Sequence, residues 1–288
     1  MIYRSVGRCI YCGATDQKLT LEHIIPECVG GDLELPDSSC EACRRLTGSI
    51  NEQQLFGDHG TYRAARVYAG TKFSENAKKS GQVMVPTFWG DGDSQVRRDM
   101  AVGEGPLGAA YLRFFGPKFL QSGNWFDDPI NPQVSYIHLA WPEQTQVTEP
   151  FSFPSLKFHQ VARFISKVSH AYAVAELGYG NFRPFLADFI SEKDDRLPYN
   201  LFGTVKSRGV NFIYDIDLIE LRARNSTFIV VTFQILSAAF FPRYKIVVGE
   251  VDRKPNTKPR RQFLQIGPWR SKKKGAEPKP GARWNSSA

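Results

Sequence analysis

Residues 9–43 read CIYCGATDQKLTLEHIIPECVGGDLELPDSSCEAC, and this stretch decides the fold. It holds two CxxC pairs, Cys9 with Cys12 and Cys40 with Cys43, with 27 residues between them. A CxxC turn can present two thiolates to the same side. Two such turns close a tetrahedral shell around zinc, with Zn–S distances of about 2.3 Å. We therefore predict a zinc ion (Zn²⁺) bound by these four cysteines. The closed shell leaves no position for a substrate, so this zinc is expected to be structural.

The segment between the two pairs carries an ionisable pair near the end of an apolar strand. Residues 19–25 read LTLEHII, and Pro26 and the glycine pair at 30–31 end the strand. Side chains alternate along a strand, so Glu22 and His23 are expected on opposite faces. Because the strand stops just after them, we expect both side chains at its rim, where they can reach one ligand.

The order of these motifs resembles the HNH endonucleases, nucleases of the ββα-metal fold. CxxC, LEHIIP, Gly-Gly and SCxxC follow one another, and a helix containing GSINE comes next. The resemblance covers residues 9–56, roughly a fifth of the chain. It implies hydrolysis of phosphodiester bonds in DNA. It also implies His23 as the general base that activates water.

The same resemblance implies a second metal, a catalytic divalent cation such as Mg²⁺ or Mn²⁺. Glu22 is the implied ligand, and Asp37 or Glu52 could add a further oxygen. The chemistry is coherent, because an imidazole has an ordinary pKa near 6.5 and can accept a proton at neutral pH. Carboxylate and phosphate oxygens are the ligands that Mg²⁺ prefers, and such a cation neutralises charge in the transition state.

An alternative function is also open, a catalytically inactive, zinc-stabilised protein that binds nucleic acid. The family usually has Asn after the second CxxC, whereas this chain has Arg44, which cannot bind a cation. A further possibility is that the large remainder of the chain carries the function. The candidate contacts to nucleic acid are arginines of the N-terminal module: Arg44, Arg45, Arg63 and Arg66.

The chain after the module is expected to form an α+β domain of unassigned role, over residues 71–251. Apolar residues in residues 155–177 recur at helical spacing and predict a long amphipathic helix, with Lys157, Arg163 and Lys167 off the apolar stripe. A hairpin is expected over residues 83–102. A C-terminal antiparallel sheet is predicted from four strand-like runs: 201–206, 210–221, 227–237 and 243–251. The predicted fold class is therefore α+β, with a zinc-stabilised ββα-metal (HNH) module at residues 1–70.

The basic residues are concentrated in the tail, residues 252–288. The chain has a formal net charge of +8, while the tail alone has 11 Lys and Arg against 2 acidic residues, a net charge of +9. Its prolines and cations predict a largely disordered arm that contacts the phosphates of a nucleic acid, with double-stranded DNA as the expected partner. A merely solubilising tail is the alternative. The sequence does not identify a protein partner.

Composition also limits where the protein acts. Residues 1–7 lack the basic-then-apolar start of a secretory signal. The longest apolar run, residues 228–241, is too short to span a bilayer. Paired CxxC motifs in a reducing compartment favour metal over disulfides. We expect a soluble, cytoplasmic protein with no membrane association.

Overall fold

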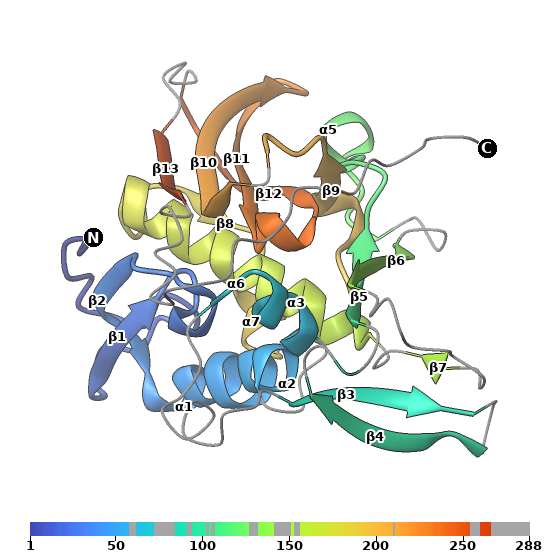
Figure 1. Cartoon of the computed structure of the whole chain (residues 1–288). Coiled ribbons are helices and arrows are strands. Elements are labelled where there is room, and N and C mark those ends of the chain that lie inside the picture. The colour runs from blue at the N-terminus through green and yellow to red at the C-terminus, as the bar shows by residue number, and fades with distance from the viewer. Residues whose placement is uncertain are drawn as a thin grey trace.

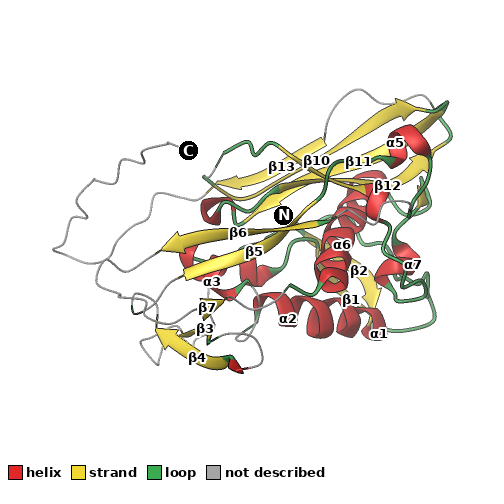
Figure 2. Cartoon of the chain, turned by 90° about the vertical axis from the view of Figure 1, so that its right-hand side faces the viewer, coloured by secondary structure: helices red, strands yellow, loops and turns green. Residues whose placement is uncertain are grey.

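A computed structural model of the chain describes the following residues: 1–57, 62–71, 84–90, 94–101, 104, 107–126, 132–140, 151–152, 156–209, 211–253 and 260–265. Figures 1 and 2 show it in two views. Helices and antiparallel sheets are both present, and the fold class is α+β.

The N-terminal module is a hairpin followed by a helix. Strands β1 (Leu19–His23) and β2 (Glu34–Cys40) pair antiparallel, with Leu19 opposite Cys40. The helix follows β2 directly, as α1 (Glu41–Arg44), the π-helical segment η2 (Arg45–Glu52) and α2 (Gln53–Phe56). This is the ββα order that the sequence predicts.

The largest sheet is antiparallel and lies in the C-terminal part of the chain. Its strands run in the order β13 (Arg260–Gln265), β10 (Phe212–Ala223), β11 (Ser226–Ile235), β12 (Arg243–Val251) and β8 (Arg183–Pro184). Strand β9 (Phe202–Val205) also pairs with β12. Four of these strands coincide with the four predicted runs, so the C-terminal antiparallel sheet is confirmed.

Helix α6 (Phe158–Leu177) is the central element of the molecule. It contacts β11 and β12 of the large sheet and η2 of the N-terminal module. Figure 1 shows it between these two parts. Every residue from Val161 to Val174 is buried. The helix therefore exists where predicted, but it is not amphipathic in the expected sense, because no solvent-exposed polar face runs along its middle.

The remaining strands form two smaller antiparallel sheets. Strands β3 (Met84–Trp89) and β4 (Val96–Ala101) form the predicted hairpin, and β7 (Phe151–Ser152) pairs with β3. Strands β5 (Leu107–Arg113) and β6 (Gln133–Ala140) pair separately. Short helical segments connect these parts: η1 (Glu27–Val29), α3 (Arg63–Tyr68), α5 (Phe119–Ser122), α7 (Ala187–Ile190), η4 (Tyr199–Leu201) and η5 (Ser237–Ala239).

Strand β13 lies within residues 252–288, the segment that the sequence predicts to be largely disordered. It pairs along β10, with Asp215 opposite Phe263 and Asp217 opposite Arg261. Arg261 Nε donates to Asp215 Oδ1 at 2.9 Å, and Tyr172 Oη donates to the Arg260 carbonyl at 3.2 Å. These contacts hold the strand to the sheet and to α6. Residues 254–259 and 266–288 of the tail lie outside the described residues.

One hydrophobic core joins the two ends of the chain. A single cluster of buried side chains includes Cys9 and Leu35 of the module, Phe164 of α6 and Val247 of β12. The module at residues 1–70 therefore shares its core with the rest of the protein. Among the described helices, none is both long and apolar enough to cross a bilayer.

Candidate metal centre and acid-histidine site

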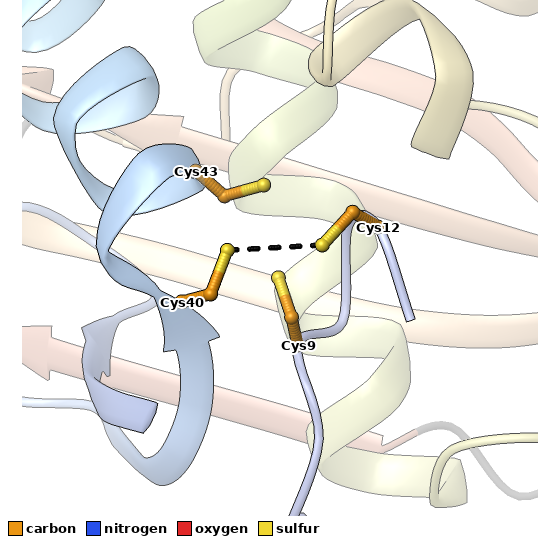
Figure 3. Close-up of side chains that lie close together, drawn as sticks. All are labelled: Cys9, Cys12, Cys40 and Cys43. Atoms are coloured by element: carbon orange, nitrogen blue, oxygen red, sulfur yellow. Dashed lines mark hydrogen bonds between the residues drawn. The ribbon is translucent and has the colours of Figure 1, made fainter. Parts of the chain in front are cut away.

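The four paired cysteines come together at the start of the module. Their sulfur atoms all lie within 4.8 Å of one another, and Cys12 Sγ is 3.7 Å from Cys40 Sγ (Figure 3). In a tetrahedral site with Zn–S bonds of about 2.3 Å, neighbouring sulfurs are about 3.8 Å apart. The Cys40 side chain comes from the end of β2 and that of Cys43 from α1. The arrangement fits a structural zinc.

The first CxxC turn is shaped by its own backbone. The Cys9 amide donates to the Ala14 carbonyl at 2.8 Å, and the Gly13 amide donates to the Cys9 carbonyl at 2.9 Å. Gly13 has a φ of 79°, a left-handed conformation that glycine adopts without strain. The turn therefore forms from local sequence, and it directs both thiols to one side.

Helix α6 holds this turn from outside the module. His170 Nε2 lies 2.8 Å from the Ile10 carbonyl oxygen, which can only accept, so Nε2 carries the proton. Burial lowers the pKa of His170, although the hydrogen bond to Ile10 opposes that shift. Helix α6 thus places a neutral imidazole in contact with the first CxxC turn.

Backbone conformation and steric crowding explain why glycines occupy positions 30 and 31. Gly30 has a φ of 89° at the end of η1. A Cβ on Gly31 would lie 2.0 Å from the Ile25 carbonyl oxygen, far inside van der Waals contact. The chain can therefore turn back closely from β1 toward β2 only with glycine at these positions.

Glu22 points into the protein, where it meets a lysine of α6. Lys167 Nζ lies 2.6 Å from Glu22 Oε1 and 2.9 Å from Glu52 Oε1, and both Lys167 and Glu22 are less than 5% exposed. Lys167 also donates to the carbonyl of His23 and lies 3.5 Å from that of Ile24. Glu52 thus forms an ion pair with the same ammonium group as Glu22 does. The structure thus brings Glu22 and Glu52 together around an ammonium group.

The titration behaviour of this group follows from burial and charge. Burial lowers the pKa of Lys167, but the carboxylates of Glu22 and Glu52 outweigh it, so the net shift is upward. Burial raises the pKa of Glu52, with Lys167 opposing the shift. Burial also raises the pKa of the nearby Tyr11 phenol well above its ordinary value, and the two carboxylates add to it. Lys167 is therefore a protonated, buried cation at neutral pH.

The residues present do not fit the divalent cation that the family resemblance implies. Glu22 and Glu52 both face the Lys167 ammonium, and the side chains of Glu22 and Lys167 are buried, so a positive charge already lies where the implied cation would bind. Asp37 is exposed and accepts a hydrogen bond from Ser5 Oγ at 2.7 Å, so it is not part of this buried group. Within the described part of the chain, the four cysteines are the only cluster that could hold a metal ion.

His23 lies at the end of β1 and faces away from Glu22. Its side chain is partly exposed, whereas Glu22 is buried, as alternation along the strand predicts. His23 Nδ1 is itself buried and has no hydrogen-bond partner among the described residues. Glu22 and His23 therefore lie in different environments, as expected for adjacent side chains on opposite faces of a strand.

The arginines predicted to contact nucleic acid separate into two groups. Arg44 and Arg45 are exposed, and Arg44 forms a salt bridge with Glu41 one turn earlier, with Nη2 2.6 Å from Oε1. Arg63 and Arg66 are buried instead. The first donates to the Met84 carbonyl and the second to the Phe56 carbonyl. The structure thus places Arg63 and Arg66, two of the predicted candidate contacts, inside the protein, where both join α3 to its neighbours.

Lys167 is the site residue that sequence reasoning missed. We expected it on the polar side of an amphipathic helix, but it lies within VARFISKVSHAYAV, residues 161–174, all of which are buried. A single lysine inside so apolar a helix is a signal, because lysine is almost never fully buried unless it is paired. Its partners, however, lie more than a hundred residues away in the chain.

The comparison with known families agrees with the cysteine and acid-histidine motifs. Residues 9–55 match the model of a family described as HNH endonuclease. No curated protein and no solved structure matches the chain. The matched range runs from the first zinc-site cysteine to α2, which is the ββα unit described above. Over residues 9–55, the chain therefore carries a module of the HNH endonuclease family, with a four-cysteine cluster that fits zinc.

Proposed function

We propose that the protein hydrolyses phosphodiester bonds in nucleic acid, with double-stranded DNA as the first candidate substrate and His23 as the general base. The observation that carries the proposal is the position of His23 within the matched family module. It is a partly exposed histidine at the end of β1, in a hairpin tied at its base by the cysteine cluster.

The proposed chemistry assigns one proton transfer to the chain. His23 accepts a proton from a water molecule as that water attacks phosphorus. The bond from phosphorus to the departing 3′ oxygen breaks, and that oxygen takes up a proton from solvent. A positioned general base of this kind contributes a hundredfold or more to rate. Lys167 holds the His23 carbonyl and so fixes the strand end from which the ring projects. We assign no step to a divalent cation at Glu22, because the Lys167 ammonium occupies that position.

The proposal is tested by incubating the full-length, zinc-loaded protein with plasmid DNA. Reactions contain Mg²⁺, Mn²⁺ or EDTA, and nicking and linearisation are followed on gels. His23→Ala is expected to lower the cleavage rate by roughly a hundredfold while leaving zinc content and fold intact. His159→Ala is the matched control, because His159 is an exposed histidine of α6 that bonds only the Asp195 carbonyl among the contacts described.

Equal rates for the wild type and His23→Ala would remove His23 from the mechanism. A wild type that cleaves neither plasmid DNA nor an RNA incubated in the same three reactions would remove the enzyme proposal altogether.

A second candidate function is nucleic-acid binding without catalysis. Its specific support is the pairing of Glu22 with Lys167, which leaves the family's usual acidic ligand inside the protein. On this reading the exposed Arg44 and Arg45 contact phosphates from the start of the helix. The wild type would then bind DNA in a gel-shift assay without cutting it, and Arg45→Ala would weaken binding.

A further inference from the structure

The oxygen atoms around Lys167 form a small cage. The ammonium group faces the carboxylates of Glu22 and Glu52 and the carbonyl oxygens of His23 and Ile24. Such a set of carboxylate and carbonyl oxygens is what a hard cation such as Mn²⁺ or Mg²⁺ binds. In this chain the cage is assembled from β1, the end of η2 and α6.

Charge explains why a cation must be present in the cage. Two carboxylates that share a buried site without a cation would repel each other, and one of them would take up a proton. Lys167 supplies the positive charge from a helix outside the matched family module, which ends at residue 55. Its side chain is only 3% exposed, so it cannot swing out to solvent without opening the core.

We propose that the Lys167 ammonium is a built-in replacement for the divalent cation of the HNH module. Wild-type protein therefore binds no divalent cation at Glu22 and Glu52, and removal of the lysine side-chain charge converts the cage into a divalent-cation site. The inference rests on the family assignment of the module. Metal binding is measured without substrate, however, so a failure of the cleavage proposal leaves this one standing.

The experiment titrates Mn²⁺ into the full-length, zinc-loaded protein and follows free Mn²⁺ by electron paramagnetic resonance. Wild type and Glu22→Gln are expected to take up the same amount of Mn²⁺. Lys167→Met, which keeps the length of the side chain without its charge, is expected to take up one further ion per chain. That ion should be lost again in the double variant with Glu22→Gln.

The control variant is Lys157→Met, at the residue that directly precedes the same helix. Lys157 is exposed and contacts the Gln54 side chain at 3.2 Å, so its loss should not change Mn²⁺ uptake. Circular dichroism and zinc content verify the fold of each variant. If Lys167→Met does not fold, the comparison of wild type with Glu22→Gln still tests whether the wild type binds a divalent cation at Glu22.

Two results would overturn the proposal. In the first, wild type binds Mn²⁺ and Glu22→Gln or Glu52→Gln abolishes that binding. In the second, a folded Lys167→Met takes up no more Mn²⁺ than wild type does.

Discussion

Cys40 is the residue on which the geometry of the N-terminal module most depends. It is the last residue of β2 and directly precedes α1, and it is buried. Its backbone pairs with Leu19 at the open end of the hairpin, while its sulfur faces Cys12. A metal bound at this position therefore connects the hairpin, the first CxxC turn and the helix at one point.

Cys40→Ser is expected to abolish stoichiometric zinc and to lower the free energy of unfolding by more than about 4 kcal/mol, since loss of a structural metal is among the most damaging single changes. Metal analysis and urea unfolding measure the two effects. Cys28→Ser serves as the control, because Cys28 is not in the cluster and burial raises the pKa of its thiol to about 11. Full zinc content in Cys40→Ser would refute the four-cysteine site.

At the scale of elements, helix α6 uses its polar residues as internal contacts. Arg163, Lys167 and His170 follow one another at helical spacing, and all three are buried. Arg163 pairs with Glu192 at 2.9 Å, Lys167 pairs with Glu22, and His170 bonds Ile10. Each polar side chain thus reaches a different segment. Replacing Lys167 or His170 leaves a buried partner without its bond, which costs more than the bond itself contributes.

The buried His170 predicts a pH dependence of stability. Burial lowers its folded-state pKa, whereas an unfolded chain takes up the proton near pH 6.5. The unfolded state then binds more protons below that pH, so the free energy of unfolding falls as the pH drops below about 6.5. His170→Gln keeps a donor for the Ile10 carbonyl but cannot titrate. Its free energy of unfolding should therefore fall less than that of the wild type as the pH drops below about 6.5.

Urea unfolding at a series of pH values compares this variant with the wild type. His159→Gln is the control, since that histidine is exposed and should leave the profile unchanged. Identical pH profiles for wild type and His170→Gln would show that His170 does not contribute to the pH dependence of stability.

At the scale of the whole molecule, the basic tail has two parts. Arg253 is paired with Glu220 and Arg261 with Asp215, so these charges belong to the folded sheet. Residues 266–288 add 6 Lys and Arg against 1 acidic residue, a net charge of +5.

A chain cut after Gln265 should bind DNA with a markedly shallower slope of log affinity against log salt, because fewer phosphate counterions are released. A cut after Val251 is the contrasting variant, since it also removes β13 and should lower the unfolding temperature. Gel-shift titrations over a range of salt concentrations give the slope. An unchanged slope after the first cut would show that residues 266–288 do not contact phosphate.

The shared core predicts that the module cannot fold by itself. Without α6, Glu22 and Glu52 would lose the Lys167 ammonium between them, and the first CxxC turn would lose its hydrogen bond from His170. A fragment of residues 1–70 with added zinc should therefore lack the dispersed amide spectrum of a folded protein, whereas the full chain should show one. A folded fragment would contradict this and would support the predicted domain boundary near residue 70.

The sequence by itself determined the four-cysteine cluster, the ββα order and four strands of the large sheet. These features depend on residues close together in the chain: a CxxC turn, the glycine pair required beside Ile25, or the apolar run of β11. Local steric rules and side-chain periodicity act over a few residues, so they can be recognised without knowing what the segment packs against.

Only the tertiary structure decided which partner each polar residue has. The helical spacing of α6 placed Lys167 off the apolar stripe, and nothing nearby in the sequence revealed that Glu22 and Glu52 would cover it. Arg66 likewise became a buried contact through Phe56, and Arg261 joined a sheet through Asp215. The same local sequence can leave a charged side chain in solvent or pair it inside the protein, because burial depends on segments that meet only when the chain folds.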